Sequence, residues 1–191
     1  MTTLTINLNP HLTLDDQQFE TICQNNKDLR FERNAKGELI IMSPTGSETG
    51  NKNSSLSGQL WFWNHQKKLG KTFDSSTGFK LPNGANRSPD VSWIKLERWE
   101  KLTVEERETF PPIAPDFVLE LMSPSDSLTD AQNKMLEYME NGVQLGWLFN
   151  RKTRIVEIYR QGREKEVLTN PQVLSGENVL LGFSLNLDIV W

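Results

Sequence analysis

Apolar residues along this chain follow two spacings, and glycine or proline residues mark the turns between the segments. A spacing of three to four residues, after start patterns at Thr13, Thr45 and Ser127, predicts helices over residues 14–25, 45–69 and 127–142. Each start pattern has the spacing of a capping box, and Asn141-Gly142 has the composition of a helix C-cap.

Short apolar or alternating runs between these helices predict strands. Residues 117–122 form the most apolar run and are expected to be a central strand. The other expected strands cover residues 29–33 and 38–42 (a hairpin turning at Gly37), 72–73, 78–81, 91–94, 146–149 and 155–159 (a closing hairpin), and 167–168 and 179–181 (edge strands). Residues 95–108 are charged with nearly cancelling signs and are expected to be a solvated surface segment. The fold class is therefore α+β.

Length and composition limit the classes of protein to which this chain can belong. A chain of 191 residues is expected to form a single domain over 1–191, and six Trp and nine Phe supply bulk for its core. The net charge of -4 argues against a generally basic nucleic-acid coat. Cys23 is the only cysteine, so the chain holds no internal disulfide and no cysteine-built metal site, and a cytoplasmic setting is expected. We expect neither a standard export signal nor a membrane span.

Two carboxylates stand in apolar strand sequences, Asp90 before the 91–94 run and Glu120 within the 117–122 run. A buried carboxylate is costly unless it is paired, hydrogen-bonded or bound to a cation. Two of them on neighbouring strands suggest a shared Mg²⁺ or Mn²⁺, since hard cations prefer oxygen ligands. Spacing alone leaves equal weight for the alternative, in which each acid sits at a strand end in water or beside an arginine.

Several motifs, in this order and spacing, resemble the Uma-type restriction endonuclease family of the PD-(D/E)XK nuclease superfamily, a family long known mainly as a domain of unknown function. The resemblance extends from about residue 28 to residue 159. The motifs are MSPTGSE at 42–48, RSPDVSWI at 87–94, PDFVLELMSPS at 115–125, KMLEY at 134–138, GVQLGWL at 142–148 and VEIYR at 156–160.

This resemblance implies a restriction-endonuclease-like mixed β-sheet core flanked by helices, with Asp90 as the PD aspartate and Glu120 as the acid of the (D/E)XK element. The lysine expected two residues after that acid is replaced by Met122. The family is thought to supply a migrated lysine from the following helix, and Lys134 is the candidate; an exposed helix lysine is the alternative. Glu48 resembles an additional metal or water contact from the first core helix, although completing the Thr45 capping box explains it without chemistry.

Basic residues are concentrated in residues 49–89, which carry six Lys or Arg against one acid, a local charge of +5 in a chain of -4. Lys67, Lys68 and Lys71 belong to this segment. It is either a phosphate-binding face or a solvated helix end whose lysines offset the helix dipole.

Three functions follow in order of preference. The first is a metal-dependent endonuclease that hydrolyses DNA phosphodiester bonds, in which Asp90 and Glu120 hold Mg²⁺ (or Mn²⁺) and Lys134 acts on water and phosphate. The second is a non-catalytic nuclease-fold module that binds DNA or a protein, because Met122 breaks the motif. The third is a two-carboxylate hydrolase of another substrate, such as a glycoside. Double-strand cleavage would favour a symmetric homodimer.

Overall fold

A six-stranded mixed sheet forms the centre of the computed structural model, which describes residues 3–191. Its strands lie in the order β11-β10-β9-β8-β7-β4, and only β8 and β9 run parallel to each other. Their bounds are β4 (Gly70–Asp74), β7 (Val91–Lys95), β8 (Phe117–Leu121), β9 (Leu145–Asn150), β10 (Ile155–Arg160) and β11 (Glu166–Thr169). The expected central strand is thus an inner strand, and β11 lies at an edge as expected.

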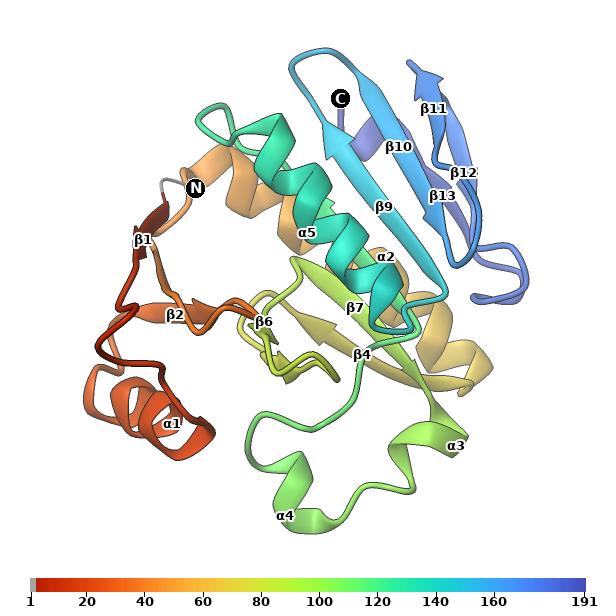
Figure 1. Cartoon of the computed structure of the whole chain (residues 1–191). Helices are drawn as coiled ribbons and strands as arrows, with labels where there is room; N and C mark the ends of the chain where they lie inside the picture. The colour runs from red at the N-terminus through yellow and green to blue at the C-terminus, as the bar shows by residue number, and fades with distance from the viewer. Residues whose placement is uncertain (1–2) are drawn as a thin grey trace.

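Two helices cover opposite faces of this sheet, α5 (Leu128–Glu140) in front and α2 (Ser47–Lys67) behind in Figure 1. The odd-numbered side chains of β8 pack with Leu56, Leu60 and Trp63 of α2. On the other face, Val118 of β8 and Met122, which comes directly after β8, pack with Met135 and Tyr138 of α5. Both faces of β8 are therefore buried, which explains its continuous apolar run. The predicted mixed sheet flanked by helices is confirmed.

A second sheet lies beside the first, in the order β1-β3-β2-β6-β5, with α1 (Asp16–Asn25) packed on it (Figure 1). Its strands are β1 (Thr3–Ile6), β2 (Arg30–Arg33), β3 (Leu39–Met42), β5 (Phe79–Lys80) and β6 (Asn86–Arg87). Strands β2 and β3 form the predicted hairpin, and Gly37 has the positive φ expected of it. Because β6 ends four residues before β7 begins, this sheet is attached close to Asp90.

Some predicted boundaries are wrong. Helix α1 is capped by Asp15, whose side chain accepts from the N–H of Gln18, and not by Thr13. Helix α2 has Gly46 at its N-cap without a side-chain cap, so the predicted capping box of Thr45 and Glu48 does not form. Aspartate is among the most favourable N-cap residues, which explains why α1 is capped by Asp15. The predicted cap of α5 at Ser127 and its C-terminal Asn141-Gly142 turn are confirmed.

The remaining corrections concern two surface segments. Residues 95–108 form α3 (Leu96–Trp99) and α4 (Val104–Arg107), and Trp99 and Leu102 are partly buried against an apolar cluster, so the segment is not simply solvated. Residues 179–181 form a turn and not an edge strand. The C-terminal strands are instead β12 (Val173–Ser175) and β13 (Ser184–Asn186), followed by the 3-10 helix η1 (Leu187–Ile189).

The helices can also be compared with the requirements of a bilayer. Within residues 3–191, no helix has both the length and the apolar character needed to cross one.

Gly70 connects α2 to the sheet through a close backbone contact. The Asn64 side chain bonds both the N–H (3.0 Å) and the carbonyl (2.8 Å) of Gly70, and the Trp93 indole N–H also donates to Asn64. A Cβ atom on Gly70 would lie 2.2 Å from the Ile94 carbonyl oxygen, so any side chain here would force backbone to move.

We predict opposite effects of one substitution at two glycines. Gly70→Ala should lower the free energy of unfolding by about 2–3 kcal/mol because the methyl group overlaps backbone. Gly58→Ala should raise it by about 0.5–1 kcal/mol, since Gly58 lies within α2, a Cβ atom there would meet nothing within 4 Å, and alanine favours helix. Urea unfolding of both variants tests this, and equal effects would contradict the close contact at Gly70.

Candidate active site

Asp90 and Glu120 lie across from each other on neighbouring strands. In the antiparallel pairing of β7 with β8, Val91 is opposite Leu119, so the preceding Asp90 meets the following Glu120. Asp90 is only 7% exposed. Its Oδ1 accepts from the Asn53 side-chain amide (2.9 Å), and its Oδ2 accepts from the N–H of Leu121 (2.8 Å). Asp90 is thereby held at the junction between α2 and the sheet.

Helix α5 delivers two side chains to Glu120. The Lys134 ammonium and the Tyr138 hydroxyl each donate to Glu120 Oε1 at 2.9 Å. Residues four positions apart lie on the same helix face, so both reach the sheet together. Met122 is buried in the apolar cluster beneath α5, on the side of the sheet where the usual lysine would stand. The structure thus brings together Asp90, Glu120 and Lys134.

A third carboxylate enters from the second sheet. Glu32 of β2 accepts from Lys134 (2.9 Å) and from the N–H of Ser88 (2.8 Å) through Oε1, and from Arg87 (3.0 Å) through Oε2. The Arg87 Nε also donates to Glu137 of α5 at 2.5 Å. Sequence reasoning missed Glu32, because alternation in a hairpin strand indicates a solvent-facing position, and only the placement of the two sheets buries it.

We call the connected charges the ion-pair cluster, which consists of Glu32, Arg87, Asp90, Glu120, Lys134 and Glu137. With every group ionised it holds four negative and two positive charges. The net charge of -2 equals the charge that one divalent cation would neutralise.

The cluster shifts the protonation of its members. Burial raises the pKa of the Glu120 carboxyl to about 7, with help from the charges of Asp90 and Glu32 and against that of Lys134. Burial also raises the pKa of Asp90. The Glu32 carboxyl has a lowered pKa because Lys134 and Arg87 outweigh its burial. Lys134 is partly buried, which lowers its pKa, but the charges of Glu120 and Glu32 raise the pKa by more, so it is an ammonium at neutral pH.

The residues fit a magnesium-type ion. Mg²⁺ is usually held by one or two carboxylates and keeps waters or substrate oxygens as its other ligands. Asp90 Oδ1 and Oδ2 each accept one hydrogen bond, and within residues 3–191 the hydrogen bonds to Glu120 are both on Oε1, so Asp90 and the Oε2 of Glu120 keep lone pairs for a cation. The Asn53 Oδ1, in the amide that binds Asp90, is a buried oxygen that has no hydrogen-bond partner within residues 3–191. Among the described residues no group of three or more His, Cys, Asp or Glu is arranged to hold a metal ion.

Glu48 is not brought into the cluster. Its side chain is 74% exposed in the first turn of α2, and its ion-pair partner is Lys52 at 3.7 Å. The α2 residue that reaches Asp90 is Asn53, which carries no charge and gave no signal in the sequence.

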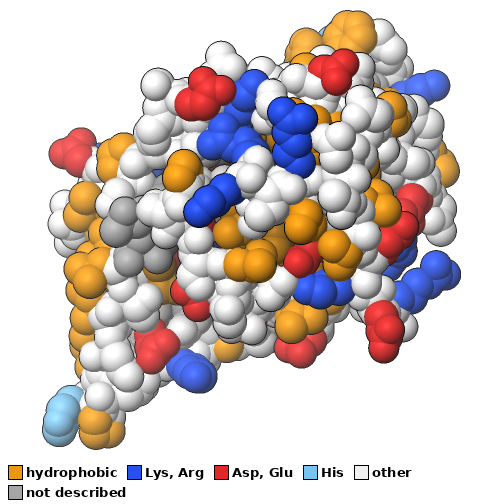
Figure 2. All heavy atoms as spheres, turned by 90° about the horizontal axis from the view of Figure 1, so that it is seen from above, with side chains coloured by type: hydrophobic (Ala, Val, Ile, Leu, Met, Phe, Trp, Pro, Cys, Tyr) orange, Lys and Arg blue, Asp and Glu red, His pale blue; other side chains and the backbone are white. Residues whose placement is uncertain are grey.

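The basic segment is divided by the fold. Three of its basic residues form ion pairs with nearby acids: Lys52 with Glu48, Lys80 with Asp16, and Arg87 with Glu32 and Glu137. Lys67, Lys68 and Lys71 lie at or beyond the C-terminal end of α2, about 20 Å along that helix from Asn53. Figure 2 shows Lys and Arg side chains in separate groups among carboxylates and apolar side chains, without one continuous basic field.

Known proteins resemble this chain in fold and in family sequence pattern. No curated protein matches the chain. The fold resembles the crystal structure of "a putative nuclease belonging to DUF820" from Anabaena variabilis ATCC 29413, with a TM-score of 0.70 and 20% identity over 83% of this chain and 88% of that chain. The model of the Uma2 family, described as "Putative restriction endonuclease", matches residues 16–188. The restriction-endonuclease-like fold class is therefore confirmed, and the chain belongs to the Uma2 family.

Proposed function

We propose that the protein is a divalent-metal-dependent endonuclease that hydrolyses DNA phosphodiester bonds. The observation that carries this proposal is that Asp90, Glu120 and Lys134 converge from three separate elements, although the lysine does not follow the acid by two residues. The nuclease family and fold support the same reaction class.

Each residue of the site has a role in this proposal. Asp90 and Glu120 would hold Mg²⁺ or Mn²⁺, which when bound polarises a phosphoryl oxygen and lowers the pKa of a water. The Asn53 amide and the Tyr138 hydroxyl orient the two carboxylates through the hydrogen bonds described above. Lys134, already protonated, acts as a hydrogen-bond donor and positive charge toward water or phosphate, and not as a base.

Glu32 and Arg87 act as positioning residues. Glu32 contacts the Lys134 ammonium at the same 2.9 Å as Glu120, and Arg87 compensates the charge of Glu32. A charged group held by two fixed partners needs little reorganisation when charge develops beside it.

A specific contact also favours the non-catalytic alternative. Lys134 bridges two carboxylates, as a purely structural ion pair would. In that case the protein would be a nuclease-fold module that binds DNA or a protein without cleaving it. Plasmid nicking by the purified protein with Mg²⁺ or Mn²⁺ separates the two, since the module would nick with neither ion.

Metal binding should depend on both strand acids. Asp90→Asn and Glu120→Gln keep the side-chain shape but remove a ligand charge, so each should weaken Mn²⁺ binding at least tenfold in calorimetric titration at pH 8. Glu48→Gln is the matched control and should bind as the parent does, because Glu48 lies outside the cluster. Parent-like binding by the first two variants would place the metal elsewhere.

The pKa of Glu120 predicts a dependence of stability on pH without metal. Its folded value, about 7, exceeds the ordinary 4.5, so the native chain retains a proton that the unfolded chain releases between these values. The stabilisation is complete below pH 4.5 and is lost as pH rises through 7. From pH 5 to pH 8, Glu120→Gln should therefore gain about 2 kcal/mol in unfolding free energy relative to the parent. Urea unfolding in EDTA measures this, and a pH-independent difference would contradict the raised pKa.

Lys134→Met should reduce Mg²⁺-dependent plasmid nicking at least 100-fold, because it removes the charge proposed to stabilise the reacting phosphate. Its Mn²⁺ affinity should change only a few-fold, since an ammonium is not a ligand of a hard cation. Lys165→Met is the matched control: Lys165 pairs at 2.9 Å with buried Glu157, outside the cluster, so its loss should leave nicking within about twofold. Undiminished nicking by folded Lys134→Met protein would exclude the lysine from the reaction.

A further inference from the structure

A groove runs between α2 and the edge strand β4, and Trp61 stands within it. Cavities of about 460 Å³ and 440 Å³ lie on either side of this side chain, and Trp61 lines both. We call this the α2–β4 groove, and the side chains used below from its first cavity are Trp61, Asn64, His65, Lys68 and Lys71. We propose that it binds an unpaired DNA strand, with a base stacked on Trp61 and phosphates on Lys68 and Lys71.

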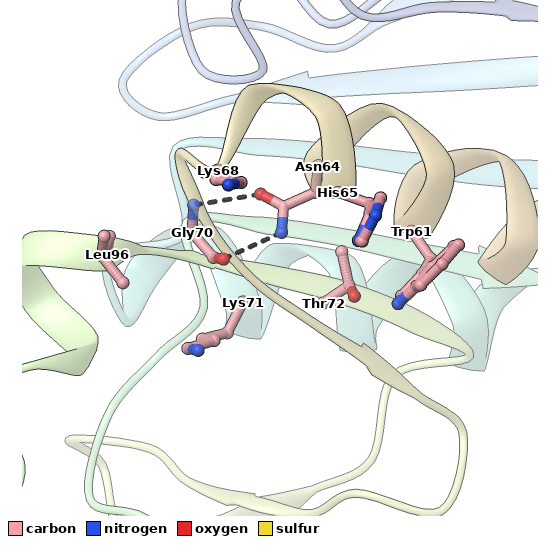
Figure 3. Close-up of a pocket in the computed structure, with 8 residues that line it drawn as sticks. All are labelled: Trp61, Asn64, His65, Lys68, Gly70, Lys71, Thr72 and Leu96. Atoms are coloured by element: carbon pink, nitrogen blue, oxygen red, sulfur yellow. Dashed lines mark hydrogen bonds between the residues drawn. The ribbon is translucent and has the colours of Figure 1, made fainter.

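The aromatic pair offers a prepared stacking surface. Trp61 is 54% exposed, which is high for so large an apolar side chain. Its ring stacks on that of His65, one helical turn later, with centroids 4.8 Å apart and planes 18° apart. Figure 3 shows both rings projecting from α2 toward Thr72 of β4. A fixed, exposed π-face binds any base by stacking, provided that the base is not already stacked within a duplex.

Positive charge lies beside these rings. Lys68 and Lys71 line the same cavity, which has no carboxylate in its lining. Among residues 3–191, neither ammonium pairs with an acid, whereas the nearby Glu97 pairs with Lys95. Asp74 lines the adjoining cavity, but its Oδ1 accepts from the Ser76 N–H and hydroxyl. Two free ammonium groups in a chain of net charge -4 are a local match for phosphates.

Lys68 occupies a backbone position that favours glycine. It is the C-cap of α2 with φ of +56°, in the left-handed region where helices commonly end with glycine. Asn64 holds this turn: its carbonyl accepts from the Lys68 N–H, and its side chain bonds the N–H and carbonyl of Gly70 (Figure 3). Lys68 thus places an ammonium-bearing side chain in the cavity lining from a position where glycine is the commoner residue.

The position and charge of the groove favour a DNA strand over a second copy of the chain. In a symmetric dimer built on this face, the lysines of both copies would meet and repel. The groove also follows β4 toward the ion-pair cluster, since Asp74 at the end of β4 pairs with Val91, next to Asp90. Along α2, Asn64 lies about 17 Å from Asn53, the Asp90 partner. The groove lies on the α2 side of the sheet and Glu120 faces α5, so a strand held in the groove would have to pass the end of β4 to reach the two carboxylates.

The test is the binding of a fluorescein-labelled 15-nucleotide oligothymidylate, followed by fluorescence anisotropy in EDTA so that hydrolysis plays no part. Trp61→Ala should weaken binding about tenfold or more. Phe62→Ala is the matched control, because Phe62 is the next residue of α2 and is 57% exposed but does not line either cavity; it should stay within about twofold. The corresponding duplex should bind more weakly than the single strand and lose little affinity in Trp61→Ala.

Lys68→Gly provides an independent arm of the test. Glycine suits the left-handed C-cap, so this variant should fold at least as stably as the parent, which urea unfolding checks. It should nevertheless bind the oligonucleotide several-fold more weakly and lower the slope of log K against log salt by about 0.7. Lys67→Ala, which removes the neighbouring charge outside the cavity lining, is its control and should lose less affinity.

Equal affinities of Trp61→Ala and Phe62→Ala would overturn the inference. So would a Trp61→Ala protein that changes from dimer to monomer in analytical ultracentrifugation while its DNA affinity stays the same, since the groove would then be an interface between copies. The inference rests on the proposed function only in taking DNA as ligand. If binding depends on Trp61 but no metal ion supports nicking, the groove is retained and the proposed endonuclease activity is refuted. If the protein nicks DNA but binding does not depend on Trp61, the endonuclease activity is retained and the groove is refuted.

Discussion

The ammonium of Lys134, shared between Glu32 and Glu120, is the interaction on which the rest of the site depends. It joins one carboxylate from each sheet to α5, with both contacts at 2.9 Å. A buried charge of either sign is expensive without a partner, and removing Lys134 would take from Glu120 its ion-pair partner within residues 3–191, while Glu32 would keep Arg87. The same contact therefore helps to hold the two sheets together and sets the position of the only lysine near Asp90 in the described cluster.

The negative charges of the cluster outnumber its positive charges, and this excess affects both the stability of the fold and the binding of a cation. Arg87 and Lys134 compensate Glu32 and Glu137, while Asp90 and Glu120 repel each other and have raised pKa values. A chain optimised for stability alone would replace one of the two with an apolar residue. The cation proposed above would restore this balance if it bound between them.

Helix α2 relates the two functional surfaces. Its buried side, with Leu56, Leu60 and Trp63, packs on the odd-numbered face of the sheet. Near its N-terminal end Asn53 reaches Asp90, and at its C-terminal end Trp61 and Lys68 line the groove with β4. Because one rigid helix carries both, the distance between the carboxylates and the groove is set by helix geometry and not by a flexible loop.

Features that depend on neighbouring residues could be predicted from the amino-acid sequence. The apolar run of β8, the Ser127 cap and the Gly142 turn of α5 are local in origin, so the fold class and the element bearing each of Asp90, Glu120 and Lys134 could be predicted, with the family resemblance indicating which lysine to consider. Local patterns also misled: the box spacing of Thr45 and Glu48 predicted a cap that does not form.

Which side chains come into contact depends on tertiary packing. Glu32 lies 88 residues before Glu120, and an alternating hairpin strand does not reveal that a second sheet will bury it against α5. Asn53 and Trp61 lie in the same helix, and their local sequence marks neither as a functional residue. In the structure Asn53 contacts Asp90, whereas Trp61 lines an open groove. The physical reason is that burial, pairing and the resulting pKa values depend on the packing of segments distant in sequence, and no local periodicity encodes that packing.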